Sequence, residues 1–383
     1  MEVRMQQPVK VVVEHNLATA VKEILEHEHL NRPFIVLDRF LLTTPAVIEL
    51  KQALADVGIE AQTYADIIPD PPAQMIDQGG QAMAAFKADS IIAIGGGSSL
   101  DSAKGINIVA SLGGSIMDYL TNETAIRGLK PLISVPTTAG TGSEMSNALV
   151  ITDEATNKKQ AILSDNILSD YALLIPELTV SLPVKQTIAS GLDAFAHAAE
   201  GYLSTLSTPM ADAIAEKIMF LLYNYLPGAV KDGKNIENRQ RVLVAASLAG
   251  WLLNQSGTIV AHSTAHILGA KYHLVHGEAV SYALPGVLEL VAPVKPKKVK
   301  EIGKILGASF KGDETPEKIA TITVKAYLHF RDKMVGLHPF VDYKLDHNEL
   351  LQNADAIVNE RFAGNTPVTL THDVVVNLLE HFG

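Results

Sequence analysis

The residues best suited to metal chemistry occur in two short segments. Four of the thirteen histidines lie between positions 262 and 276, where an even spread along the 383 residues would place fewer than one. His262 and His266 are four residues apart, and upstream Asp193 and His197 repeat this spacing. Residues four apart lie on one face of an α-helix, so each pair can approach one metal ion from a single helix.

A third direction of approach comes from His276, because a helix end is expected near Gly269, between it and His266. One carboxylate and three imidazoles suit Fe(II) or Zn(II) and leave a coordination position for water or a substrate oxygen. This donor set comprises Asp193, His197, His262 and His276. Any single histidine could instead have a structural role, but the spacing of the set favours a metal centre. His273 is given no role. The remaining eight histidines, which exclude His197 and the four between 262 and 276, are expected at the surface.

A glycine-rich segment offers a second chemistry. Residues 91–104 read as an apolar strand, three glycines and a helix that Ser98 could cap. Glycine backbone can approach a phosphate closely, and the free N–H groups of a first helical turn meet its charge. We therefore expect Gly96, Gly97 and Ser98 to hold a pyrophosphate. The segment lacks the Lys of a Walker A motif and the GxGxxG spacing, and the alternative is a turn that needs glycine only for positive φ.

Two further features fit a dinucleotide. Asp38 ends an apolar strand, where a carboxylate can accept hydrogen bonds from a ribose and repel a 2′-phosphate, which favours NAD over NADP. The segment 137–144 follows another apolar strand and suits a ligand with sugar and amide groups. Its hydroxyl residues are Thr137, Thr138, Thr141 and Ser143. The alternatives are an exposed strand-end carboxylate and an ordinary surface loop.

Apolar runs alternate with helical patterns along the first 180 residues. Strands are expected at 34–37, 90–94 and 132–135, and a helix at 45–57. Such alternation predicts βαβ units around a mostly parallel sheet.

The pattern changes after the proline-flanked segment 176–183. Helical spacing then dominates, with long helices expected at 186–203, 209–226 and 238–254. The sequence thus predicts two domains, an α/β domain over residues 1–180 and an all-helical domain over 181–383.

Charge and composition narrow the function classes. With 31 basic and 42 acidic residues the net charge is −11, so nucleic acid and anionic membranes are poor partners. The basic run 295–300 is interpreted as a solvated helix start. No cysteine is present, which excludes disulfides and thiolate chemistry. Neither a membrane span nor the apolar core of a signal peptide is apparent, so a cytoplasmic location is expected.

Taken together, these motifs resemble the iron-containing (group III) alcohol dehydrogenases. The resemblance rests on four ordered segments and extends to residues 365–373, nearly the whole chain. The segments are Gly95–Lys104, Pro136–Glu144, Gly191–Glu200 and His262–Gly277. Three shorter phrases look most like the short-chain alkanol dehydrogenases of propanediol and ethanolamine breakdown. They lie at 40–45, 68–71 and 272–277.

The resemblance implies an N-terminal dinucleotide-binding α/β domain, an all-helical metal-binding domain, and a homodimer or larger homo-oligomer. It implies hydride transfer between NAD(H) and a short-chain alcohol or aldehyde, with Fe(II) as the first choice of metal and Zn(II) as the second. The four proposed ligands match the metal ligands of the family, and His266 matches its histidine beside the nicotinamide, expected to relay a proton. Matching cofactor contacts are Asp38, Gly96, Gly97, Ser98, Thr137, Thr138, Thr141, Ser143 and Lys159.

The sequence departs from the family at three positions. Ile175 stands where relatives usually carry Asp, Ser190 replaces a common Thr, and Val275 replaces the usual Pro. None is a ligand, so the departures concern local geometry. Two alternatives stay open: a glycerol dehydrogenase or dehydroquinate synthase type of enzyme, which relies on three protein ligands, and a non-catalytic NAD-binding protein in which the ion only stabilises the fold.

Overall fold

A six-stranded parallel sheet organises the first of two structural units. In the computed structural model, which describes residues 5–156 and 158–383, this sheet unit spans residues 6–138 and 142–180, and the helical unit is built on 181–383 with the loop tip 139–141. The strands, in the order β1-β8-β5-β4-β2-β3 across the sheet, are β1 (Lys10–Val13), β2 (Pro33–Leu37), β3 (Gln62–Tyr64), β4 (Ser90–Gly95), β5 (Leu132–Pro136) and β8 (Tyr171–Leu174).

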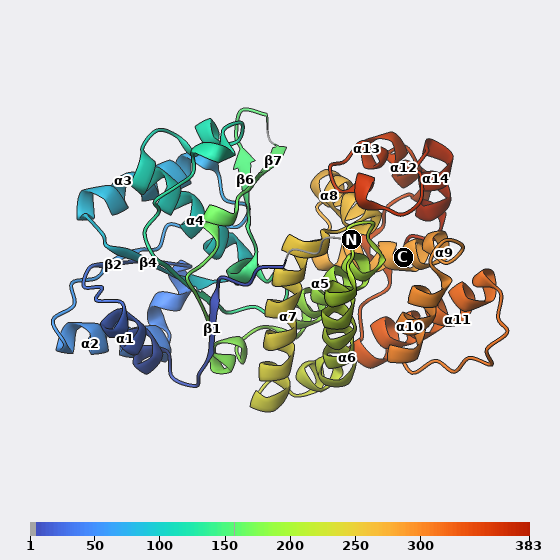
Figure 1. The fold of residues 1–383 in the computed structure, drawn as a ribbon, viewed down its shortest axis with the longest axis horizontal. Helices are drawn as coiled ribbons and strands as arrows, with labels where there is room; N and C mark the ends of the chain where they lie inside the picture. The colour runs from blue at the N-terminus through green and yellow to red at the C-terminus, as the bar shows by residue number, and fades with distance from the viewer. Residues whose placement is uncertain (1–4, 157) are drawn as a thin grey trace. The chain divides into compact units, whose positions relative to one another are not determined.

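Helices cover both faces of this sheet (Figure 1). They are α1 (Leu17–His27), α2 (Pro45–Asp56), α3 (Ala73–Phe86) and α4 (Gly97–Leu112). Side chains of β2 alternate between two cores: Phe34 and Val36 pack with α3 and α4, whereas Ile35 and Leu37 pack with α1 and α2. A central parallel strand is therefore apolar on both sides, which explains the uninterrupted apolar runs. A separate antiparallel hairpin joins β6 (Ala148–Asp153) and β7 (Lys158–Leu163).

The order in which the chain adds strands across the sheet reverses between β2 and β4. From β2 the chain moves outward to β3 at one edge, and then crosses to β4 and β5 on the other side of β2. Ligands of open α/β sheets bind at the carboxyl ends of the strands at such a point. Asp38 follows β2, and the three glycines span the end of β4 and the start of α4, so the fold brings these two predicted features to the same edge of the sheet.

The predicted elements of this unit are confirmed, with small shifts at their ends. The three predicted strands lie within β2, β4 and β5, and the predicted helix at 45–57 is α2, which ends at Asp56. The predicted cap is wrong: α4 begins at Gly97 with Gly96 as its N-cap, and Ser98 lies inside the first turn. The N-terminal N–H groups of α4 therefore follow directly on the glycines.

The second unit is all-helical, as predicted. The three long helical segments expected from the sequence are contained in α5 (Val184–Leu203), α6 (Pro209–Lys231) and α7 (Ile236–Ser256). The helices after them are α8 (Val260–Tyr272), α9 (His276–Val291), α10 (Pro296–Ile305), α11 (Pro316–Leu328), α12 (His347–Leu351), α13 (Ala354–Val358) and α14 (His372–Glu380). Nearly all of α5 is buried, because alanines on its faces let neighbouring helices approach closely.

Two details of this unit differ from expectation. Helix α8 does not end near Gly269 but continues to Tyr272, and the chain turns at His273, whose φ is 57°. The basic run 295–300 does begin a helix, but it is less solvated than expected: Lys295 donates to the carbonyls of Leu203 and Ser204 at the end of α5.

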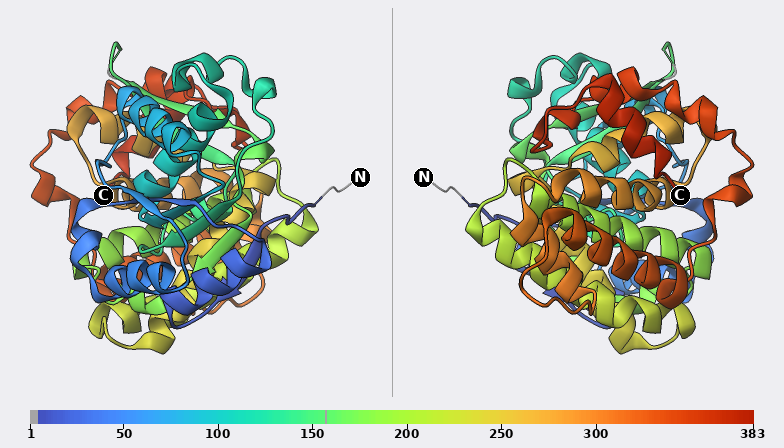
Figure 2. Two further views of the ribbon diagram at one scale, coloured as in Figure 1. Left: turned by 90° about the vertical axis from the view of Figure 1, so that its left-hand side faces the viewer. Right: turned by 90° about the vertical axis from the view of Figure 1, so that its right-hand side faces the viewer.

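The C-terminal segments return to the helices that carry the histidines. Helix α13 packs against α8, and α14 packs against α9; the right-hand view of Figure 2 shows these red segments beside the orange ones. Among the described helices none alone has the length and hydropathy of a membrane span, whereas α7 and α8 reach that composition only as a pair bent by 107°.

Candidate metal centre and cofactor site

The candidate cofactor residues of the sheet unit meet where β2 and β4 end. A Cβ atom on Gly95 would lie 3.0 Å from Asp38 Oδ2 and 2.5 Å from Ser99, and one on Gly96 would lie 3.3 Å from Thr138 Cγ2. Only glycine lets the backbone lie this close to the neighbouring segments. Burial raises the pKa of the Asp38 carboxyl above its usual value.

The two predicted loops are also in direct contact. The Thr137 N–H donates to the Gly95 carbonyl at 2.9 Å, so the loop after β5 lies alongside the glycine loop after β4. The N–H groups at the start of α4 complete an anion-binding arrangement of the kind that holds a pyrophosphate. The structure thus brings together Asp38, Gly96, Gly97, Ser98, Thr137 and Thr138.

The remaining three cofactor candidates lie in other surroundings. Ser143 is buried: Lys104 Nζ lies 3.1 Å from its Oγ, and that hydroxyl donates to Asp101 at 2.5 Å. Thr141 is exposed and belongs to the loop tip of the helical unit. Lys159, on β7, is half exposed and binds Asp70 at 2.6 Å.

Buried Lys104 holds the segment after β5 in place through hydrogen bonds to its backbone. Its ammonium donates to the carbonyls of Ser143, Ser146 and Ala148 at 2.7–2.9 Å. These three carbonyl oxygens match the three N–H donors of the buried ammonium, which is therefore satisfied without a ligand. The Asp-x-x-Lys spacing of the glycine motif therefore supports the neighbouring loop from inside.

The predicted metal ligands converge within the helical unit. Asp193 and His197 come from α5, His262 from α8 and His276 from the first turn of α9. Asp193 Oδ1 lies 3.8 Å from His197 Nε2, 3.6 Å from His262 Nε2 and 3.5 Å from His276 Nε2. Tetrahedral coordination with bonds of 2.0–2.2 Å separates ligand atoms by roughly 3.3–3.6 Å. One acidic oxygen thus faces three imidazole nitrogens at distances that fit a shared ion.

The hydrogen bonding of these atoms supports the same interpretation. Asp193 Oδ1 and His262 Nε2 are buried and have no hydrogen-bond partner, which is costly unless something else satisfies them. Ligand atoms of Asp193, His262 and His276 lie within 4.8 Å of one another. His197 is not in that compact group, although its ring stacks on His262 with centroids 4.6 Å apart. The donor set fits a divalent ion of the Fe(II) or Zn(II) kind.

The pKa values of Asp193 and His197 are shifted in ways that suit metal ligands. Burial opposes ionisation of Asp193, but the neighbouring imidazoles outweigh it and hold the pKa of this carboxyl below its usual range. Burial lowers the pKa of His197 to about 4 despite the opposing charge of Asp193, which keeps this imidazole neutral and able to act as a ligand.

Glu200 belongs to one of the sequence motifs but was not predicted to have a role at the site. Its fully buried carboxylate pairs with His262 Nδ1, and its other oxygen accepts the N–H groups of Ile259, Ala261 and His262 at 2.7–3.3 Å. Burial lowers the pKa of His262, but Glu200 and Asp193 outweigh it and raise the value to about 9. Glu200 therefore caps α8 and turns His262 Nε2 toward Asp193.

Close packing between α9 and α5 fixes the position of His276, the first residue of α9. A Cβ atom on Gly277 would lie 2.1 Å from the Ala189 carbonyl oxygen of α5, so glycine allows α9 to begin against α5. Val275, which replaces the usual proline, has φ −63°, the angle that proline itself would impose. Valine here keeps a φ that proline could adopt, and the Val275 N–H donates to the Tyr343 hydroxyl at 3.3 Å.

The other two departures are equally compatible with the fold. Ile175 is buried in the apolar core beneath α1 and α2, and Ser190 faces Gly140, where a Cβ atom would approach it to 2.6 Å. His266 follows His262 by one turn, and its ring stacks on that of His276 at an interplanar angle of 13°.

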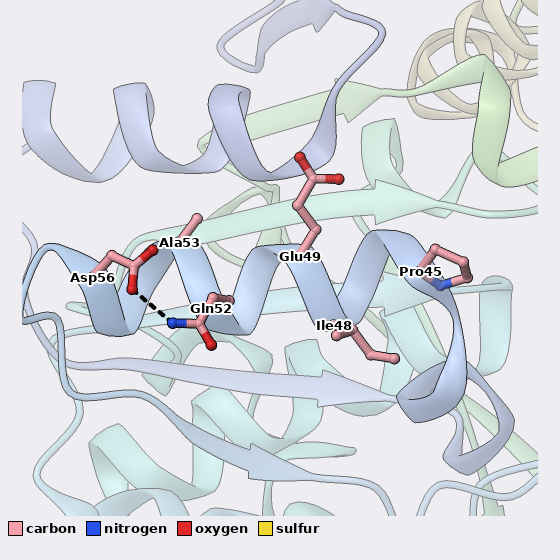
Figure 3. A pocket seen from close by; sticks show the side chains of 6 residues that line it. All are labelled: Pro45, Ile48, Glu49, Gln52, Ala53 and Asp56. Carbon is pink, nitrogen blue, oxygen red and sulfur yellow. Dashed lines mark hydrogen bonds between the residues drawn. The ribbon is translucent and has the colours of Figure 1, made fainter.

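A hollow elsewhere on the sheet unit carries none of this chemistry. It lies over the outer face of α2 between Pro45 and Asp56, and Figure 3 shows that Gln52 donates to Asp56 along the helix.

Comparisons with known proteins identify the family of this chain. Residues 8–176 match the family described as iron-containing alcohol dehydrogenase, and residues 187–382 match the C-terminal part of the Fe-containing alcohol dehydrogenase family. The NAD-dependent methanol dehydrogenase of Bacillus methanolicus is 35% identical over 77% of this chain and 78% of its own. The 1-propanol dehydrogenase PduQ of Citrobacter freundii is 34% identical over 68% and 66%.

Solved structures give the same result for the fold. A 1,3-propanediol oxidoreductase superposes with a TM-score of 0.92 at 27% identity, covering all of both chains. The alcohol dehydrogenase from Oenococcus oeni superposes with a TM-score of 0.89, also at 27% identity and over both complete chains. The resemblance found in the sequence is confirmed: this chain belongs to the iron-containing alcohol dehydrogenases and is a metal-dependent oxidoreductase of that family.

Proposed function

We propose that this enzyme interconverts short-chain primary alcohols and their aldehydes with NAD(H), using one divalent ion held by Asp193, His197, His262 and His276. The observation that carries the proposal is the convergence of three imidazole nitrogens on a single buried carboxylate oxygen, 3.5–3.8 Å away, that has no other partner. Fe(II) is our first choice of ion and Zn(II) the second, since the donor set accepts both.

When bound, the ion supplies a Lewis acid and the nicotinamide supplies the hydride acceptor. The chain's own residues then position the reactants and move the proton. His266 takes the hydroxyl proton of the alcohol and passes it toward solvent, a step suited to an imidazole whose ring is 35% exposed. It is not proposed as a ligand.

The proposed cofactor contacts follow from the residues that meet where β2 and β4 end. The glycines Gly96 and Gly97 and the N–H groups at Ser98 hold the pyrophosphate, and Asp38 accepts the hydroxyls of the adenosine ribose. Thr137 and Thr138 lie beside the same glycines. Family resemblance alone supports contacts from Thr141, Ser143 and Lys159, and for Ser143 the contact would have to come from a residue already bound to Lys104 and Asp101.

The names of the relatives guide the choice of substrate. Enzymes called methanol dehydrogenase and 1-propanol dehydrogenase align with most of this chain, which supports a small alkanol or its aldehyde. We also infer a homodimer or larger homo-oligomer and a cytoplasmic location, both supported by the family alone.

Anaerobic reconstitution tests the proposal. Metal-free enzyme is loaded separately with Fe(II), Zn(II), Mn(II) and Co(II), and NADH absorbance is followed with propanal and a panel of other aldehydes. We expect turnover of propanal in at least one metal form, and none in a matched Asp193→Asn variant. No turnover in any form would favour a non-catalytic protein, and faster oxidation of glycerol than of 1-propanol would favour a polyol dehydrogenase.

A further inference from the structure

A buried carboxylate from a distant part of the chain contacts the relay histidine. Glu360 lies between α13 and the short 3₁₀ turn Ala363–Asn365, 94 residues from His266 in sequence. Its Oε1 lies 3.1 Å from His266 Nδ1. The Glu360 side chain is only 14% exposed, so this contact is shielded from competing water and is stronger than a surface pair.

The remaining partners of Glu360 define its chemical state. Its other oxygen, Oε2, accepts from Ser263 Oγ at 2.6 Å and from the Phe362 N–H at 2.8 Å. All three groups around the carboxylate are donors or can act as donors, as an ionised carboxylate requires. A carboxylate can only accept, so Nδ1 of His266 must carry a proton, and Nε2 of the neutral ring is left with its lone pair.

The ring of His266 is also held from its sides. His276 stacks on it with centroids 5.4 Å apart, and the Phe362 ring lies 5.7 Å away. Phe362 follows Glu360 closely in sequence, so one short segment supplies both the carboxylate and an aromatic wall. Packing and hydrogen bonding together select one orientation and one tautomer of the imidazole.

We propose that Glu360 is a positioning residue that fixes His266 in its Nδ1–H tautomer, so that Nε2 is the atom that accepts the proton of the alcohol. The inference rests on the proposed function. In oxidation the O–H bond of the alcohol breaks and its proton goes to Nε2, while the C–H electron pair leaves with its hydrogen as hydride to the bound nicotinamide. His266 is then an imidazolium, which the Glu360 carboxylate stabilises until Nε2 releases the proton to solvent.

Substitution by glutamine separates this role from simple packing. The Phe362 N–H is a backbone donor that cannot turn away, so the carbonyl oxygen of Glu360→Gln should stay with it. The new NH₂ group then faces His266 Nδ1, which must become an acceptor. Shape and volume are kept, whereas the tautomer of His266 is expected to change to Nε2–H, the form that cannot accept the proton of the alcohol.

The test combines nitrogen NMR with kinetics. Protein labelled with ¹⁵N-histidine is compared with its Glu360→Gln variant, metal-free and loaded with diamagnetic Zn²⁺, and the His266 signals are identified by their loss in His266→Asn. We expect protonated Nδ1 in the wild type and protonated Nε2 in the variant. The kcat for oxidation of 1-propanol should fall about 10- to 100-fold, with bound metal unchanged. Glu380→Gln, an exposed change on α14, is the matched control and should alter neither quantity.

The outcomes separate the inference from the proposed function. An Nε2–H tautomer in the wild type, or an unchanged tautomer in Glu360→Gln, would overturn the inference whatever the rates show. A changed tautomer with an unchanged kcat would overturn the catalytic importance of Glu360. Wild-type enzyme that binds metal and shows the expected tautomer, but turns over no alcohol or aldehyde in any metal form, would refute the proposed function instead.

Discussion

Replacing Glu200 by glutamine should weaken metal binding without unfolding the protein. One carboxylate oxygen of Glu200 accepts three backbone N–H groups, from Ile259, Ala261 and His262, at the start of α8. The carbonyl oxygen of glutamine can keep those bonds. Its NH₂ group then faces His262 Nδ1, which favours a proton on Nε2, the atom that faces Asp193. A protonated Nε2 cannot ligate.

The size of the effect follows from the loss of an oriented ligand. Removing the carboxylate partner of a ligating histidine typically costs 10- to 100-fold in metal affinity, which corresponds to about 1.4–2.8 kcal/mol. The buried negative charge at the start of α8 is also lost, and its interaction with the helix dipole contributes about 1 kcal/mol to the stability of the fold. We therefore expect a clear loss of affinity and a modest loss of stability.

Competition with a chromophoric chelator measures the affinity for Zn²⁺ or Co²⁺ at fixed pH, and chemical denaturation measures the stability. Glu216→Gln is the matched control. Glu216, on α6, accepts a hydrogen bond from Tyr202, which lies on α5 like Glu200, but Glu216 is outside the metal cluster. A metal affinity of Glu200→Gln within about twofold of wild type, far below the 10-fold minimum, would refute the orienting role of Glu200.

Three further predictions follow from other parts of the structure. Asp38→Ser should raise the ratio of kcat/KM for NADPH over NADH by about tenfold or more, because a carboxylate repels a 2′-phosphate; an unchanged ratio would contradict its role at the ribose. Gly277→Ala should lower the free energy of unfolding by about 3 kcal/mol, since its Cβ would lie 2.1 Å from the Ala189 oxygen; a denaturation midpoint equal to wild type would refute this. Burial lowers the pKa of Lys104 to about 8 from 10.5, so the unfolded chain binds more protons between those values and stability should rise there with pH relative to Lys104→Met; parallel pH profiles of urea unfolding would contradict it.

Local patterns carry much of what could be predicted. The strands around β2, β4 and β5 were predictable because a central parallel strand is apolar on both faces. Asp193 with His197, and His262 with His266, were predictable as pairs because spacing by four is set by helix geometry alone. The glycines after β4 were predictable because close backbone approach excludes other residues there.

What could not be predicted depends on tertiary contacts. Glu200 appeared in a motif, but its role depends on α8 beginning directly above it, which no local pattern reveals. Glu360 reaches His266 across 94 residues, and nothing in its own segment resembles a site. The predicted end of α8 was wrong because the helix tolerates Gly269 in its interior. The prediction that Lys295 is solvated missed the carbonyls at the end of α5 to which it donates.

The most direct test of the central claim is anomalous diffraction from crystals of the enzyme loaded with Fe(II) or Zn(II), recorded on both sides of the metal absorption edge. The account predicts one strong peak per chain, about 2.0–2.2 Å from Asp193 and from the Nε2 atoms of His197, His262 and His276. A peak at another position, or coordination that leaves out Asp193, would contradict it.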